Sequence, residues 1–203
     1  MGTGRLEAFS DGVFAIAITL LILEIRVPAN SGARLGDDLL HIWPSYFAYV
    51  TSFLTIGIMW INHHALFQRI GRVDRMLLLI NTLFLMLVAF VPFPTRLVAE
   101  HLHGAGERDA ALAYGITFVI TALFFNAFWL YASRGRRLIP ESIPQARIDE
   151  ITRGYAPGVF IYGAATLVAL ASPIAAIGLF LAIAVFYALP ESLWDRMLRR
   201  PVR

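Results

Sequence analysis

The 203-residue sequence contains no cysteine and no lysine, and charged residues make up only 15% of it. Without cysteine the chain has no disulfide framework, no thiolate metal site and no cysteine nucleophile. Soluble domains carry about a quarter of their residues as charges, so the low charge content excludes an ordinary soluble domain. Hydrophobic residues make up 58% of the chain. A transmembrane helix needs roughly 20 apolar residues, so this content suffices for about six helices across a membrane.

The long uncharged runs define the expected helices. A 36-residue run from Gly154 to Leu189 contains Ser172-Pro173, a turn signal, so we divide it into a hairpin of two spans. The first run, Gly12 to Leu23, becomes long enough only if Asp11 or Glu24 enters the membrane. We predict an all-α polytopic membrane protein, a single membrane domain over residues 1–203, with six transmembrane helices at about 8–27, 42–64, 76–95, 110–133, 154–171 and 174–190.

The basic residues, all of them arginine, predict the orientation of the helices. With six spans, thirteen of the 17 arginines lie on the side that holds both termini, and four lie on the other side. Cytoplasmic loops carry the excess of basic residues, so we expect a multi-pass protein of the cell (plasma) membrane with both termini cytoplasmic. The net charge of +3 reflects this bias. We therefore expect membrane lipid as a partner and do not expect nucleic acid. A cleaved signal peptide is not expected, because Glu7 and Asp11 follow Arg5.

The segment from Arg5 to Ile25 has the most specific pattern. On a helix with 100° per residue, Ile16, Leu20 and Leu23 fall within about 60° of one another and form an apolar stripe, with Thr19 at its edge. Ser10 and Asp11 point away from the stripe, toward whatever packs behind the helix. A carboxylate at membrane depth must be paired or reach water, so Asp11 needs a partner.

The end of the second span offers partners for Asp11. This span returns toward the cytoplasm, so Trp60, His63 and His64 are expected at the same membrane level as Ser10 and Asp11. Both histidines are three or four residues after Trp60 and share its helix face. The indole N–H and the imidazoles are donors that we expect to hold the Asp11 carboxylate.

Two motifs in the first two spans can be written R-x-x-x-F-S-D and W-x-x-H, and they consist of Arg5, Phe9, Ser10, Asp11, Trp60 and His63. Together with the six-span layout, they resemble the bacterial members of the endolysosomal potassium channel family, the transmembrane protein 175 type. The resemblance implies one six-helix repeat per subunit and a homotetramer in which the first helix of each subunit lines the central pore. It also implies a channel without a carbonyl selectivity filter, and no T-V-G-Y-G-like loop is present in the sequence.

The resemblance also implies roles for individual residues. The apolar constriction of the family corresponds to Ile16, Leu20 and Leu23, with Thr19 as a polar position beside it. Combining these motifs with the contacts expected above, we assign the bracing of the first helix to Arg5, Phe9, Ser10, Asp11, Trp60, His63 and His64. The apolar neck would be on the order of 10 Å long on an α-helix. Such a neck penalises ions that hold water tightly, so we expect K⁺ as the permeant ion with modest preference over Na⁺, and the resemblance also permits proton permeation.

Other interpretations remain open at the level of sequence. Asp11 with His63 or His64 is also typical of the buried relay of a proton-coupled secondary transporter, although broken helices and matched halves are not apparent. Ser10 and Asp11 are also common helix N-cap types. No metal site or cofactor is expected, because His63 and His64 diverge and the pair at 101 and 103 lies in a polar loop. An enzyme is not expected, because the later spans hold few ionisable groups beyond tyrosine.

Overall fold

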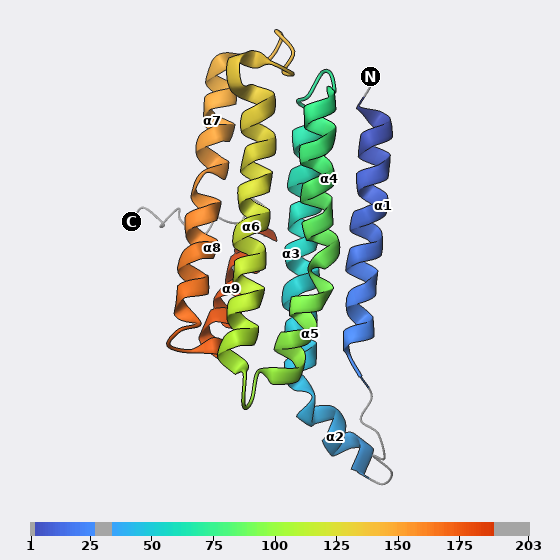
Figure 1. Cartoon of the computed structure of the whole chain (residues 1–203), viewed down its shortest axis with the longest axis vertical. Helices are drawn as coiled ribbons and strands as arrows, with labels where there is room; N and C mark the ends of the chain where they lie inside the picture. The colour runs from blue at the N-terminus through green and yellow to red at the C-terminus, as the bar shows by residue number, and fades with distance from the viewer. Residues whose placement is uncertain (1–2, 27–33, 189–203) are drawn as a thin grey trace, which may run out of the picture.

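The computed structural model describes residues 3–26 and 34–188, and within these ranges it is all-helical. The helices run up and down beside one another as an elongated bundle (Figure 1). In chain order the elements are α1 (Gly4–Leu20), the 3₁₀ turn η1 (Leu21–Glu24), α2 (Leu35–His41), α3 (Trp43–Phe67), α4 (Arg75–Phe90), α5 (Pro92–His101), α6 (Glu107–Ser133), η3 (Arg134–Arg136), α7 (Gln145–Tyr155), α8 (Pro157–Val168) and α9 (Pro173–Ala188).

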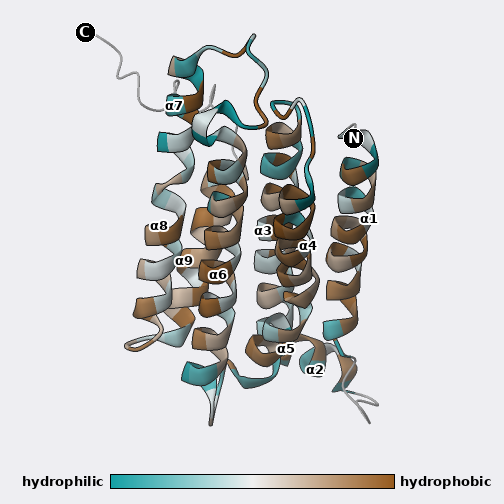
Figure 2. Ribbon diagram, turned by 45° about the horizontal axis from the view of Figure 1, so that its top comes forward, coloured by the Kyte–Doolittle hydropathy of each residue, from teal (hydrophilic) through white to brown (hydrophobic). Residues whose placement is uncertain are grey.

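Several of these helices are long and apolar enough to cross a membrane, and the chain is an all-α polytopic membrane protein. Four stretches meet the length and hydropathy requirements within the described ranges: Gly4–Glu24, Trp43–Phe67, Arg75–His101 and Glu107–Arg136. Pro173–Ala188 is a shorter apolar helix. Figure 2 shows hydrophobic residues along the middle of the helices and hydrophilic residues toward both ends of the bundle. The total of six spans stays a prediction, and the expected ends at residues 27 and 190 lie outside the described residues.

Two of the expected spans are interrupted by a proline. The third stretch breaks at Val91, where α5 begins with Pro92, and α8 begins with Pro157 directly after α7. Proline has no N–H and favours the first turn of a helix, so each proline starts a new helix instead of continuing the old one. Helix α7 continues the column of α8 (Figure 1). The helical structure therefore begins at Gln145, before the start of the predicted span 154–171. A turn at residues 169–172 separates α8 from α9, where the sequence indicates a hairpin.

Helix α6 is central to the bundle and packs against α4, α5 and α8, whereas α1 lies at one edge against α3 and α4 (Figure 1). The contact between α6 and α8 is close because Gly115 has no side chain. A Cβ at this position would overlap the Thr166 side chain of α8. Within the core, the Ser52 hydroxyl lies 2.8 Å from the Thr95 hydroxyl and 3.0 Å from the Tyr114 hydroxyl, which links α3, α5 and α6.

The end of the bundle that holds the start of α1 and the loops at 68–74 and 134–144 is called here the arginine-rich end (Figure 1). Two side chains cross-link its loops. Arg72 donates from Nη2 to the Arg137 carbonyl oxygen at 2.7 Å. Tyr131 donates its hydroxyl to Asp74 Oδ2 at 2.6 Å, and the Arg137 guanidinium lies 4.9 Å from the centre of the Tyr131 ring. These contacts fix where α4 begins relative to the end of α6.

Asp74 is the N-cap of α4, and its replacement by alanine is expected to lower the free energy of unfolding by about 1 kcal/mol. The Leu77 N–H would lose its acceptor, 2.9 Å away, and the Tyr131 hydroxyl would lose another. The Tyr131 and Leu77 donors also lower the pKa of Asp74, so the stabilisation is present above the ordinary pKa and is lost as pH falls through the lowered one. Thermal unfolding in detergent measures the effect. An Asp74→Asn control keeps an oxygen acceptor, and equal midpoints for wild type and Asp74→Ala would contradict the assignment.

Candidate ion pathway on the first helix

Helix α1 has one face buried in its own subunit and one face that no helix of residues 3–26 and 34–188 covers. The buried face repeats every three or four residues and consists of Leu6, Ser10, Phe14, Ala17 and Leu21. On the opposite side the three residues of the apolar stripe are exposed: Ile16 by 61%, Leu20 by 42% and Leu23 by 67%. Exposed apolar side chains on a membrane helix face lipid, another subunit or a pore, so this face is where α1 meets its surroundings.

The turn η1 changes the geometry at the end of the stripe. The sequence predicts a continuous α-helix, but residues Leu21–Glu24 form a 3₁₀ helix. With three residues per turn, Leu23 lies one full turn above Leu20 and stays on the same face. Because the rise per residue is larger in a 3₁₀ helix, the stripe from Ile16 to Leu23 is roughly 12 Å long, slightly longer than the sequence estimate.

Thr19 lies at the edge of the stripe and is exposed. Its hydroxyl oxygen lies 2.8 Å from the Ala15 carbonyl oxygen and 3.0 Å from that of Ile16, so the hydroxyl proton is donated back to its own helix. The lone pairs of Oγ1 therefore remain as acceptors on the exposed side of α1. A hydroxyl oxygen of this kind can contact a cation directly or through a water molecule.

Behind the stripe, a chain of buried hydrogen bonds joins α1, α4 and α3. Ser10 donates to the Leu6 carbonyl oxygen at 2.8 Å and accepts from Asn81 Nδ2 at 3.0 Å. Asn81 Oδ1 lies 2.9 Å from His63 Nε2. Because the amide nitrogen of Asn81 is used on Ser10, its oxygen accepts and His63 Nε2 carries the proton. Ser10, Asn81 and His63 are all buried, so this chain fixes α1 against its neighbours.

His63 is enclosed by aromatic rings. The centres of the Phe14, Phe67, Phe84 and Phe128 rings lie 5.3, 4.7, 5.7 and 5.9 Å from that of the imidazole, and Phe84 stacks on it nearly parallel. His63 Nδ1 has no hydrogen-bond partner among the described residues. Protonation of Nδ1 would place a charged N–H in an apolar cage without an acceptor, so the neutral tautomer fits this site.

A second pair of contacts lies nearer the surface of the subunit. Trp60 Nε1 donates to Asp11 Oδ1 at 2.9 Å, and His64 Nδ1 lies 2.7 Å from Glu7 Oε1. Glu7 and Asp11 are one turn apart on α1, and Trp60 and His64 are one turn apart on the antiparallel α3. The four side chains therefore form two successive rungs between the helices, and Trp60 and His64 also stack with ring centres 6.2 Å apart.

The geometry corrects one expectation about this region and excludes one alternative. His63 was expected to hold Asp11, but it bonds Asn81 of α4. His63 and His64 differ by 100° around α3, and the side chains that reach α1 are Trp60, which bonds Asp11, and His64, which pairs with Glu7. Ser10 and Asp11 are not an N-cap, since α1 begins at Gly4 with Thr3 as its N-cap. Arg5 and Phe9 are exposed and, within residues 3–26 and 34–188, form no side-chain hydrogen bond, ion pair or ring contact, so their part in bracing α1 stays a prediction.

A transporter relay through Asp11 and His63 is not supported. Asp11 bonds the indole of Trp60, which does not titrate, and the hydrogen bond of His63 goes to an amide. Sequence reasoning also missed Asn81, the residue that joins Ser10 to His63. The available signal was a lone amide inside the apolar run 76–95, since polar groups in membrane helices are costly unless paired.

The far end of α1 carries charged groups that pair within the subunit. Arg96 Nε lies 3.9 Å from Glu24 Oε2 and 2.9 Å from Glu100 Oε1, and Arg26 lies 3.6 Å from Glu100. These pairs join the residues at the end of the stripe, Glu24 and Arg26, to α5.

Comparison with known proteins identifies relatives of the chain. A family model described as the endosomal/lysosomal potassium channel TMEM175 matches residues 5–92. A potassium channel of Chamaesiphon minutus is 44% identical over 190 residues, covering 92% of this chain and 94% of that protein. A potassium channel of Streptomyces collinus is 50% identical over 153 residues, covering 73% and 74% of the two chains.

The fold is also similar to a solved structure. The crystal structure of a lysosomal potassium-selective channel TMEM175 homolog from Chamaesiphon minutus matches with a TM-score of 0.84 at 43% identity, covering 92% of this chain and 96% of that one. These relatives are named channels and not enzymes, in agreement with the expectation from sequence. Since the matches extend over most of both chains, the resemblance seen in the two motifs is confirmed, and the chain belongs to the TMEM175 potassium channel family.

Proposed function

We propose that the chain is a K⁺-permeable cation channel in which four subunits place their α1 helices around a central pore. The observation that carries this proposal is the exposed stripe of Ile16, Leu20 and Leu23 on a helix whose other face is buried. The names of the relatives support the ion, because the proteins from Chamaesiphon minutus and Streptomyces collinus are potassium channels. In the tetramer the three residues of each copy form a hydrophobic constriction, and Thr19 lies beside it.

The packing around α1 supports a pore over a purely lipid-facing stripe. Helix α1 is at the edge of the subunit, so a symmetry axis can approach it without passing through other helices (Figure 1). Gly12 and Ala15 are small and exposed on this side, and a Cβ at Gly12 would meet nothing within 4 Å. Small residues let helices approach closely, as a four-fold axis requires.

A constriction of this kind selects by dehydration. Three apolar rings of four side chains each, together about 12 Å deep, exclude water unless an ion brings its own shell, and the ion that gives up water most easily passes at the lowest cost. K⁺ holds water less tightly than Na⁺, so modest K⁺ preference follows without a carbonyl cage. The Thr19 hydroxyl oxygen supplies an acceptor next to the apolar residues. Proton permeation through the same path belongs to this proposal as a further expectation.

The buried chain of Ser10, Asn81 and His63 and the two rungs at Asp11 and Glu7 hold α1 at a fixed rotation. At 100° per residue, Thr19 lies about 60° from Ile16, so a rotation of α1 by that angle would move Ile16 away from the axis and bring Thr19 toward it. Arg5 and Phe9, which form no such contacts among the described residues, are left available on the surface that subunits share. We place the arginine-rich end in the cytoplasm and the channel in the plasma membrane.

Purified protein in liposomes tests the function. A K⁺ gradient is expected to drive K⁺ flux that exceeds Na⁺ flux under matched gradients, and native mass spectrometry of the same preparation is expected to give a tetramer. The oligomer measurement separates failed assembly from failed permeation. Liposomes that stay tight to K⁺ although they contain verified tetramer would contradict the proposal.

A further inference from the structure

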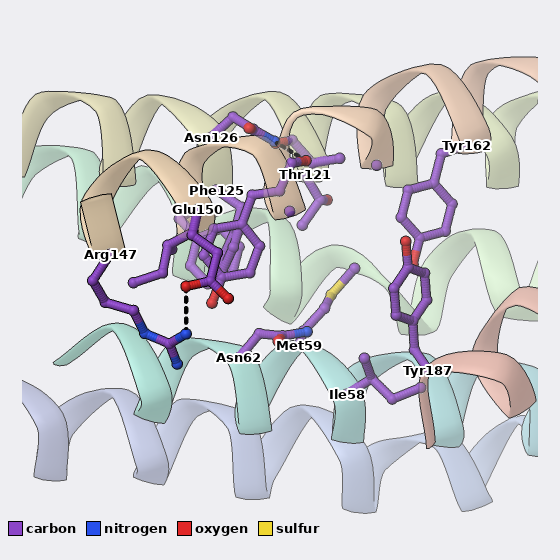
Figure 3. A pocket seen from close by; sticks show the side chains of 16 residues that line it. Ile58, Met59, Asn62, Thr121, Phe125, Asn126, Arg147, Glu150, Tyr162 and Tyr187 are labelled. Carbon is purple, nitrogen blue, oxygen red and sulfur yellow. Dashed lines mark hydrogen bonds and ion pairs between the residues drawn. The ribbon is translucent and has the colours of Figure 1, made fainter. Parts of the chain in front are cut away.

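A cavity of about 350 Å³ lies apart from α1, between α3, α4, α6, the α7 and α8 column, and α9 (Figure 3). This volume is within the range of small-molecule binding sites, which are largely apolar with a few polar groups. The contacts that position the stripe use none of its polar residues. The cavity is therefore a separate feature of the subunit.

The two ends of the cavity differ in chemistry (Figure 3). Arg147 and Glu150 on α7 form an ion pair of 2.6 Å at one end, and Tyr162 and Tyr187 lie at the other. The 15 residues from Arg147 to Tyr162 rise about 22 Å along the helices. The cavity thus runs from the polar α7, near the arginine-rich end, to the apolar middle of the bundle.

Two glycines keep one wall of the cavity open. Gly154 and Gly158 lie one helical turn apart, both line the cavity, and a Cβ at either position would meet nothing within 4 Å. Ile58, Met59 and Phe125 contribute apolar surface to the same space. A cavity lined by glycine and apolar side chains at membrane depth fits an extended hydrocarbon chain.

Polar groups whose side chains have room for further hydrogen bonds also line the cavity. Within residues 3–26 and 34–188, the Asn62 amide and the hydroxyls of Tyr162 and Tyr187 form no side-chain hydrogen bond. A polar group at membrane depth that lacks a partner is costly, because lipid chains offer no hydrogen bonds. A ligand with ester oxygens beside its hydrocarbon chain would supply acceptors to these donors.

We propose that the cavity binds a zwitterionic phospholipid, phosphatidylethanolamine, with its phosphate at Arg147, its ammonium at Glu150 and one acyl chain beside Gly154 and Gly158. The head group is chosen by charge complementarity. The α7 end of the cavity presents one positive and one negative side chain three residues apart, and this head group carries one charge of each sign. A purely anionic head group would face Glu150 with like charge. The leaflet depends on the proposed orientation of the chain, whereas the binding site does not.

Lipid retention measured by native mass spectrometry tests the site without reference to channel activity. Protein from nanodiscs with equal phosphatidylethanolamine and phosphatidylglycerol is expected to retain the ethanolamine lipid. Gly158→Leu places a side chain in the cavity and is expected to reduce lipid retention about tenfold, a loss of about 1.4 kcal/mol of binding free energy. Gly163→Leu is the matched control, because Gly163 is on the same helix, has equal space for a Cβ and does not line the cavity.

A second variant tests the head group. Glu150→Arg changes an exposed side chain, so it is expected to leave folding intact and to shift retention toward phosphatidylglycerol. Retention of phosphatidylglycerol or of neither lipid by the wild type would overturn the proposal. Equal retention by wild type and Gly158→Leu, or an unchanged lipid preference in Glu150→Arg, would overturn it as well.

Discussion

Ile16→Ala is expected to raise K⁺ flux through reconstituted channels about tenfold and to weaken the preference for K⁺ over Na⁺, which corresponds to roughly 1.4 kcal/mol off the barrier. Ile16 is 61% exposed and is the stripe residue nearest the start of α1, and each subunit contributes one copy. Four shorter side chains widen the neck, so water enters more easily and the dehydration cost that separates the two ions falls. Flux of both ions in liposomes measures the change.

Ile22→Ala is the control for this variant. Ile22 is 52% exposed on η1, the turn that continues α1, but lies off the stripe, so Ile22→Ala removes the same atoms without widening the neck. If Ile16→Ala and Ile22→Ala leave flux and selectivity equally unchanged, the assignment of the constriction is wrong. If both raise flux equally, the stripe does not define the pore face.

Asn81→Ala is expected to destabilise the protein more than any other polar substitution discussed here. Asn81 is fully buried and joins Ser10 to His63. Its removal leaves the buried His63 Nε2–H without an acceptor, at about 1–3 kcal/mol, takes away the donor to Ser10 Oγ, and opens a small cavity between α1 and α4. The expected result is a clear fall in the midpoint of thermal unfolding, together with reduced K⁺ flux because α1 loses its fixed rotation.

Thr82→Ala is the matched control, since the neighbouring Thr82 is exposed and bonds only the Leu78 carbonyl of its own helix. A double-mutant cycle with Ser10→Ala isolates the contact between α1 and α4, and a coupling energy of about 0.5–3 kcal/mol is expected for directly bonded residues. Additive effects of Ser10→Ala and Asn81→Ala would show that the hydrogen bond does not couple the helices.

The helical pattern and the two motifs made the first helix predictable from sequence. A period of 3.6 residues separates the apolar stripe from Ser10 and Asp11, and the uncharged runs locate most helices to within a few residues. Local signals of this kind depend only on residues close in sequence. The hairpin at Ser172-Pro173 is a similar case, because proline excludes helix continuation locally.

Contacts between helices were less predictable. Placing His63 on Asp11 requires only that α3 faces α1, but the actual partner depends on α4 lying between them deeper in the bundle, which brings Asn81 to both Ser10 and His63. The spacing of His63 and His64 indicated divergence without showing which one turns inward. The 3₁₀ turn at the end of α1 was likewise missed, because Leu21–Glu24 has no proline or glycine to signal it.

The absence of cysteine from the native sequence allows a direct test of the pore. Leu23→Cys introduces a single thiol at a position that is 67% exposed on the stripe, and Leu167→Cys introduces one at a position that is 65% exposed on α8. The measurement is K⁺ current before and after a charged, membrane-impermeant thiol reagent. The pore assignment predicts block of Leu23→Cys and no change in Leu167→Cys. Unaltered current through Leu23→Cys after verified labelling would contradict it.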